Sequence, residues 1–404
     1  IIALTTAQAA TLTSTQVAAL SPGLISSLEA QDVAALSKTS IAGMSAEQIG
    51  ALGASQIIAL TTTQANTLSS EQIAALTTDQ ISNFETVDLA SLSTIAISGL
   101  SAEQAAALST SQLQALQTRQ IAALKTEVVA SLSSDQIVAL TSSQARALTV
   151  DQIVAMTTAQ IAALETADLA ALRNSAFMSI SIEQAAALST AQIAAMTTRQ
   201  VASLANNILS SLSTSQILAL TSAQSANLTS TQATALTTTQ MAAFETADLA
   251  ALSTAAISAM SPEQIAALST SQISALTTMQ VASLTTDVIN AMETGQINAL
   301  SSTQKASLTT SQIGALSTIQ ISIFTTGDIA ALTTSEISAL NTEQMTGLDT
   351  AQIAALTPRQ IAALSTEQIA SFSTAQIVGL TATQTAVFSS QQTVALSSEQ
   401  IAAM

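Results

Sequence analysis

The chain of 404 residues repeats one pattern of eight residues from end to end. Leu4, Leu12 and Leu20 set the spacing, and each of the 51 positions in this register, from Leu4 to Met404, is Leu, Met, Phe or Ile. We number this repeat, the octad, from that residue. Position two is Ser or Thr in 38 of 50 octads, and position five is Gln in 36. The pattern predicts one continuous array over 1–404 with no linker and no domain boundary.

Composition excludes most kinds of chemistry for this array. His and Cys are absent, so disulfides, thiolate or imidazole metal sites and His-dependent triads are excluded. Eight Lys and Arg against 25 Asp and Glu give a net charge of −17, which does not suit binding to nucleic acid. We therefore expect no enzyme activity, no cofactor and no nucleic-acid partner. Polar residues recur in every octad, so we also expect no membrane span.

Three residue types indicate that each octad is one short helix. Ser or Thr at position two with Gln at position five forms the capping box that begins a helix. Pro22, Pro262 and Pro358 all occupy position three, the first helical position, where a missing N–H costs nothing. All 25 acidic residues lie at positions two, four or five, near the positive end of a helix dipole. We predict a helix from position three to the next position one in each octad.

The alternatives to short helices fit less well. One continuous helix would rotate its apolar stripe by about 80° per octad, because eight residues overshoot two turns. A β-solenoid would suit the Thr, Ile and Val content, but it gives the three prolines no reason to share one position. The predicted fold class is therefore an all-α solenoid, or superhelix, of about 50 single short helices.

Helices this short need neighbours, since an isolated seven-residue helix does not form in water. Position six and the next position one are three residues apart and share a helix face, so we expect both in a common core. Position eight is nearly always Ala, Ser or Gly, and a small residue there lets another helix approach closely. The glycines at this position are Gly43, Gly99, Gly347 and Gly379.

A second, 80-residue period overlies the octads. Acids and aliphatic residues alternate every five octads at position five: Asp88, Val128, Asp168, Ile208, Asp248, Val288 and Asp328. Position six departs from its usual aliphatic residue every ten octads, at Ala65, Ala145, Ser225, Lys305 and Thr385, and Phe84, Phe244 and Phe324 keep the same register with Leu164. The period is open to two interpretations, duplication history alone or five octads per superhelical turn. The second interpretation predicts an exposed self-association stripe made of the seven position-five residues.

The same register contains the candidate ligand groups. Glu85 with Asp88, and the equivalent pairs later in the chain, could bind a cation, since such ions take hard oxygen ligands. Two carboxylates without a glycine-turned loop fall well short of a calcium site, so we interpret them as helix-start acids and expect no metal. Lys305 is a charge at a core position, for which we expect an edge location or a side chain that reaches out to water.

Two resemblances to known families bear on function. The segments Met260–Leu268 and Leu364–Phe372 resemble the helix openings of TAL-effector repeats, although the DNA-reading loop of those repeats is absent here. The uninterrupted array resembles the octapeptide-repeat tracts of very large bacterial surface and adhesin-like proteins. That resemblance covers the whole chain and implies an extracellular structural role, with this chain as a fragment of a longer array.

We expect a structural repeat protein that forms an extracellular rod, stalk or filament by lateral self-association and serves attachment to cells or surfaces. Its expected partners are copies of itself, since a charge spread at about four per hundred residues leaves little repulsion between chains. An alternative is an adhesin or ligand-binding solenoid that recognises a peptide or glycan. A weaker alternative is an ice-binding Thr array on a β-solenoid.

Overall fold

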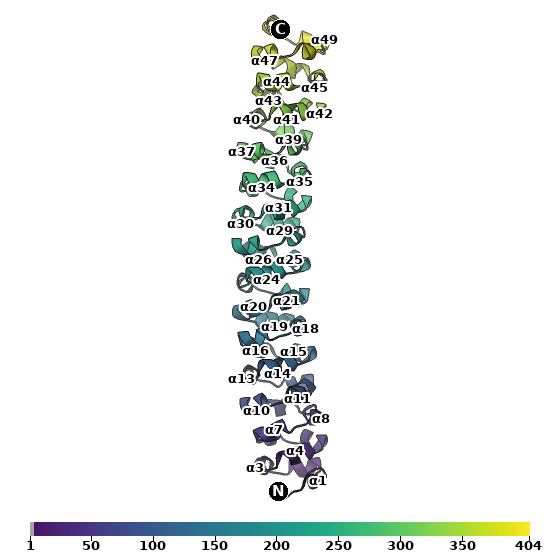
Figure 1. Cartoon of the computed structure of the whole chain (residues 1–404), viewed down its shortest axis with the longest axis vertical. Coiled ribbons are helices and arrows are strands. Elements are labelled where there is room, and N and C mark those ends of the chain that lie inside the picture. The colour runs from purple at the N-terminus through teal and green to yellow at the C-terminus, as the bar shows by residue number, and fades with distance from the viewer. Residues whose placement is uncertain (1–3) are drawn as a thin grey trace. The chain divides into compact units, whose positions relative to one another are not determined.

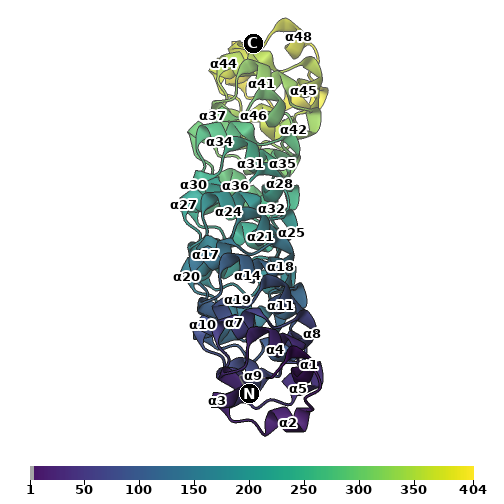
Figure 2. The same cartoon turned by 60° about the horizontal axis from the view of Figure 1, so that its bottom comes forward.

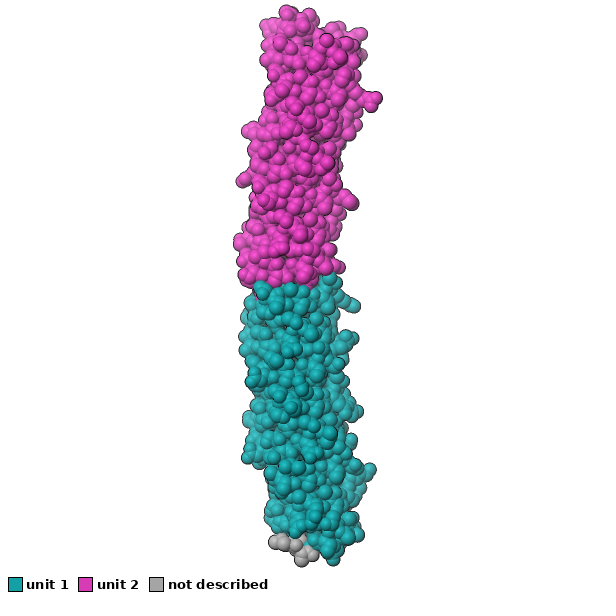
Figure 3. Space-filling view, viewed as in Figure 1, with its two compact units in different colours: residues 1–204 teal, residues 205–404 magenta. Residues whose placement is uncertain are grey.

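A computed structural model describes residues 4–404, and they fold into short helices without a strand among them. The chain divides into two compact units, residues 1–204 and 205–404 (Figure 3). The helices of unit 1 are α1 (Thr6–Ala9), α2 (Ser14–Ala18), α3 (Pro22–Ser26), α4 (Ala30–Ala35), α5 (Lys38–Ala42), α6 (Ala46–Gly50), α7 (Ala54–Ile58), α8 (Thr62–Ala65), α9 (Ser70–Ala74), α10 (Thr78–Ser82), α11 (Thr86–Ser91), α12 (Thr94–Ile97), α13 (Ala102–Ala106), α14 (Thr110–Ala115), α15 (Thr118–Ala123), α16 (Thr126–Ala130), α17 (Ser134–Val138), α18 (Ser142–Ala147), α19 (Val150–Ala155), α20 (Thr158–Ala163), α21 (Thr166–Ala171), α22 (Asn174–Phe177), α23 (Ile182–Ala186), α24 (Thr190–Ala195) and α25 (Thr198–Ser203).

Unit 2 continues the same one-helix-per-octad pattern. Its helices are α26 (Asn206–Ser211), α27 (Thr214–Leu218), α28 (Ser222–Ser225), α29 (Ser230–Ala235), α30 (Thr238–Ala243), α31 (Thr246–Ala251), α32 (Thr254–Ser258), α33 (Pro262–Ala266), α34 (Thr270–Ala275), α35 (Thr278–Ser283), α36 (Thr286–Ala291), α37 (Thr294–Ala299), α38 (Ser302–Lys305), α39 (Thr310–Ala315), α40 (Thr318–Ser322), α41 (Thr326–Ala331), α42 (Thr334–Ser338), α43 (Thr342–Gly347), α44 (Thr350–Ala355), α45 (Pro358–Ala363), α46 (Thr366–Ala370), α47 (Thr374–Val378), α48 (Ala382–Thr385), α49 (Ser390–Val394) and α50 (Ser398–Ala403). The all-α solenoid is confirmed, and the β-solenoid alternative is wrong for residues 4–404.

The helices begin where the capping pattern predicts. In α20 the Thr157 hydroxyl accepts from the Gln160 backbone N–H at 3.2 Å, and Gln160 Oε1 accepts from the Thr157 backbone N–H at 2.8 Å. The prolines Pro22, Pro262 and Pro358 are the first residues of α3, α33 and α45. Each capping-box bond satisfies a backbone donor that a helix start otherwise leaves unpaired, and proline has no such donor.

The helices end earlier than predicted. They contain four to six residues, and each ends at or before position eight. Leu164, which follows α20, has φ −58° and ψ 131°, an extended conformation that turns the chain toward the next N-cap. The prediction of a helix that runs to the next position one is therefore wrong, since the following Ser or Thr needs extended backbone to act as a cap.

Successive turns of the solenoid stack within each unit. Helices three apart along the chain pack against each other: α10, α13 and α16 lie one above the other in Figure 1, and α8 lies beside α11 in Figure 2. Side-chain hydrogen bonds join residues 28 and 31 apart, which links helices four apart. One turn thus contains between three and four octads, so the interpretation with five octads per turn is wrong.

Apart from the first and last few octads, the core contains three positions of each octad. In α20 and the residue after it, Ile161 is fully buried, and Gln160 and Leu164 are each 3% exposed. The prediction that positions six and one form the core is confirmed. Position five is also buried, which the sequence interpretation missed. Burial of an amide side chain at almost every helix start requires hydrogen-bond partners for both ends of that amide.

The buried glutamines link one turn of the solenoid to another. Gln160 Oε1 belongs to the cap, while its Nε2 donates to the backbone carbonyls of Val129 at 2.9 Å and Leu132 at 2.7 Å. These carbonyls lie at and just beyond the end of α16, where a helix leaves acceptors unpaired. One side chain therefore satisfies the start of one helix and the end of another, and the same bonds recur along both units.

Position eight packs closely against a position-three residue 29 places earlier in the chain. Ser131 donates to the Ala102 carbonyl at 3.1 Å, and a Cβ added to Gly99 would collide with the backbone of Ser70. The expected close approach at this position is confirmed. No helix among residues 4–404 has the length and the apolar character that a membrane span requires.

Candidate functional site

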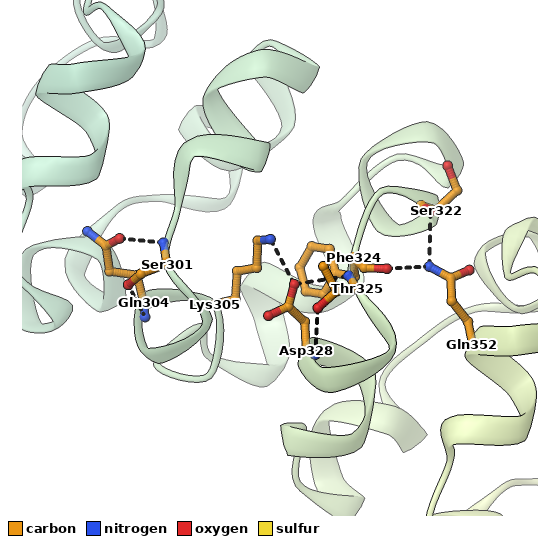
Figure 4. Close-up of polar contacts among 8 residues, drawn as sticks. All are labelled: Ser301, Gln304, Lys305, Ser322, Phe324, Thr325, Asp328 and Gln352. Carbon is orange, nitrogen blue, oxygen red and sulfur yellow. Dashed lines mark hydrogen bonds and ion pairs between the residues drawn. The ribbon is translucent and has the colours of Figure 1, made fainter.

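One polar pair of the 80-residue period meets inside the solenoid. Lys305, at the end of α38, donates from Nζ to Asp328 Oδ2 of α41 at 2.8 Å, with side chains 5% and 1% exposed (Figure 4). These two residues are 23 apart. The same separation relates Ala65 to Asp88, Ala145 to Asp168 and Ser225 to Asp248. Each position-five Asp of the 80-residue period thus faces the position-six residue that lies 23 places earlier in the chain. We call each such pair, in the interior of the solenoid, an acid site.

The Lys305 site is the most fully partnered of the four. The ammonium group lies 5.2 Å from the centroid of the Phe324 ring, a cation–π distance. Asp328 Oδ2 also accepts from the Thr325 backbone N–H at 3.0 Å. Burial opposes ionisation of Asp328, but hydrogen bonds from Lys305, Ser302 and Thr325 outweigh it and lower the pKa to about 2. The expectation of an edge or water-facing Lys305 is wrong, because an internal carboxylate neutralises it.

The other acid sites lack a cation at the lysine position. Burial, and to a smaller extent the charge of Glu85, raises the pKa of Asp88 to about 6. Burial raises the pKa of Asp168 as well, although a 2.7 Å hydrogen bond from the Ser142 hydroxyl opposes it. Ser222 donates to Asp248 in the same way at 2.6 Å. A serine hydroxyl 26 residues earlier thus donates to Asp168 and Asp248, as Ser302 does to Asp328.

Several polar atoms at these interior positions have no partner among the described residues. They are Asp32 Oδ1, Asp168 Oδ2, Ser225 Oγ and Asp328 Oδ1. An unpaired buried oxygen lowers the free energy of unfolding. The acids therefore destabilise the array locally, at positions where the consensus glutamine would donate to carbonyls of another turn. Aspartate is one methylene shorter than glutamine and, when ionised, has no proton to donate to a carbonyl of another turn.

The predicted self-association stripe does not lie on the surface. All seven side chains are at most 5% exposed: Asp88, Val128, Asp168, Ile208, Asp248, Val288 and Asp328. The expectation of an exposed row is therefore wrong, because position five of these seven octads faces the core. The five-octad rhythm instead marks places where the series of bridging glutamines is interrupted, alternately by an acid and by an aliphatic residue.

The Glu-x-x-Asp pairs lie at helix starts, as interpreted from the sequence. Glu85, Glu165 and Glu245 are the N-cap residues of α11, α21 and α31, and none of them makes a side-chain cap bond. In the fourth site Thr325 takes this place and completes a capping box with Asp328. Within residues 4–404 no group of three or more acids could hold a metal ion.

A surface site that the sequence interpretation missed lies elsewhere in unit 1. Arg146, Arg173 and Arg199 line one pocket of about 390 Å³, together with Asn174, Ser175 and Thr197. The three arginines follow one another at intervals close to one superhelical turn. That spacing is visible in the sequence, but it predicts that the three side chains are neighbours only once the number of residues per turn is known.

A comparison with curated proteins gives no match. The family model described as the ALTTAQ repeat matches the chain eight times, at residues 25–62, 81–118, 113–150, 161–198, 241–278, 258–286, 289–326 and 321–358. These matches lie in both units and together cover more than half of the residues. The chain therefore belongs to the ALTTAQ repeat family.

Proposed function

We propose that this chain is a structural repeat protein whose stacked turns build an extracellular rod, stalk or filament for attachment to cells or surfaces. The observation that carries the proposal is the bonding of each turn to others through buried glutamines, as in Gln160 to Val129 and Leu132. Such bonds run along the solenoid and recur in both units. In a solenoid, interactions between near neighbours give stability that grows with repeat number, which suits a spacer whose length is set by the number of octads.

Self-association is the second part of the proposal. Positions two and three are mostly exposed Ser and Thr, as at Thr197 and Thr198, while position four carries many of the charged residues of the chain. We place the contact between chains on this hydroxyl-rich surface, since the position-five acids are internal. Thinly spread charge leaves little repulsion against packing side by side. The role is mechanical and needs no catalytic group.

Imaging and scattering test the rod. Negative-stain images of native material should show fibres, and discrete monomers at high concentration would favour the alternative, a ligand-binding solenoid. A variant that lacks residues 85–164 removes one 80-residue period from unit 1 and keeps the octad register. Its length by X-ray scattering should fall in proportion to the residues removed, and an unchanged maximum dimension would contradict the spacer role.

Localisation needs a separate measurement. Antibody labelling of intact cells of the source should reach the repeat array without permeabilisation, because the proposal places it outside the cell. Labelling only after permeabilisation would refute the extracellular part and leave the rod to be judged by the scattering result.

A further inference from the structure

The pocket lined by Arg146, Arg173 and Arg199 is the strongest concentration of positive charge in a chain that carries only eight Lys and Arg. Arg146 lies near the end of α18, Arg173 is the N-cap residue of α22, and Arg199 lies in the first turn of α25. Helix α18 packs on α21, the helix just before Arg173, and α22 packs on α25, so the three side chains come from successive levels of the stack. The pocket belongs entirely to unit 1.

None of these arginines is neutralised by the protein. All three are exposed, and among residues 4–404 none of them makes an ion pair or a side-chain hydrogen bond. Three guanidinium groups on one pocket repel each other, and the chain as a whole has a charge of −17 that offers many acids for pairing. Their unpaired clustering therefore lowers stability unless an anion from outside occupies the pocket.

We infer that this pocket binds an oxyanion-bearing ligand about the size of one acidic sugar. Guanidinium groups bind carboxylate, sulfate and phosphate groups through paired hydrogen bonds. The Asn174 amide, the Ser175 hydroxyl and the Thr197 hydroxyl line the same pocket and offer partners for sugar hydroxyl groups. The pocket has a volume of about 390 Å³ and is open to solvent, so a ligand reaches the arginines directly. This binding goes beyond the proposed structural role and does not depend on it.

The chain itself supplies conservative replacements for the test. Gln117 is a natural N-cap residue like Arg173, Gln114 occupies the octad position of Arg146, and Gln391 occupies that of Arg199. The triple variant Arg146→Gln, Arg173→Gln, Arg199→Gln should therefore fold, with a circular dichroism melt at or above that of the original chain. Arg359→Gln is the matched control, because Arg359 lies twenty octads after Arg199 in the same register, where Ala306 and Thr333 replace the other two arginines.

The experiment titrates the full chain with inorganic sulfate, glucuronate and glucose, followed by the arginine side-chain NMR signals and by calorimetry at low salt. We expect saturable binding at one site per chain, with shifts at Arg146, Arg173 and Arg199, no response to glucose, and at least a tenfold loss in the triple variant. Tighter binding of glucuronate than of sulfate assigns a carboxylated sugar, and the reverse assigns a sulfate or phosphate ester. Equal, non-saturating shifts at Arg119 and Arg359, or unchanged binding in the triple variant, overturn the proposal.

Discussion

Lys305→Ala tests whether the buried lysine is a structural counter-ion. The change removes the ammonium that lies 2.8 Å from Asp328 Oδ2 and gives this site the alanine that Ala65 and Ala145 supply to the first two. Removing one partner of a buried ion pair destabilises a protein by about 3–5 kcal/mol, because the other charge remains buried. Both side chains are at most 5% exposed, so we expect a loss in this range at pH 7.

The pKa of Asp328 gives an independent readout. The hydrogen bond from Lys305 is the largest of the influences that lower this pKa to about 2, while burial raises it. Without the lysine, burial should dominate and the pKa should rise above the ordinary value, as it does at Asp88. Adding Asp328→Asn to Lys305→Ala removes the stranded charge and should recover most of the lost stability.

Hydrogen exchange is the appropriate assay, because repeat arrays need not unfold in one step. Amide exchange in α38 and α41 should quicken in Lys305→Ala, stay unchanged in the distant helices of unit 1, and return toward the original rates in the double variant. Carbon-detected NMR titration of Asp328 gives the pKa. If exchange in α38 is unchanged and the pKa of Asp328 stays near 2, the lysine is not a counter-ion and the reasoning is refuted.

Three further perturbations test the other interior contacts. Burial and Glu85 raise the pKa of Asp88 to about 6, so the stabilising protonated form is lost as pH rises from about 4 to 7. Asp88→Asn should therefore raise the stability of unit 1 at pH 7 by up to about 3 kcal/mol and change it little near pH 4. Equal effects at both pH values in denaturant titrations would contradict this. Gln160→Ala leaves one backbone N–H and two carbonyls without their partner, so it should lower the free energy of unfolding by roughly 3 kcal/mol in denaturant titrations. The control Gln114→Ala, at an exposed side chain, should change that free energy by no more than about 0.5 kcal/mol. Similar losses in the two variants would rule out the bridging role. Gly99→Ala should lower the free energy of unfolding by about 1–3 kcal/mol, because the added Cβ meets the Ser70 backbone. Gly23→Ala should not, because there is open space around its Cβ. Calorimetric melts that rank the two variants the other way would refute the close approach.

The sequence by itself determined the helices. Capping boxes, prolines and acids act within four residues of each other, so their meaning does not depend on the rest of the fold, and Pro262 begins α33 as its position predicts. The apolar pair at positions six and one, as in Ile161 and Leu164, likewise follows from local geometry and lies in the core.

The tertiary structure decided how the octads are wound and which distant residues meet. The number of octads per turn depends on the angle between successive helices, and extended residues such as Leu164 and the packing of position eight set that angle. A winding of three to four octads brings Gln160 onto α16, Lys305 onto Asp328 and the three arginines into one pocket. An eight-residue pattern repeats identically whatever the winding, so the partners of a buried amide or a buried lysine follow only from the superhelix that the packed side chains adopt.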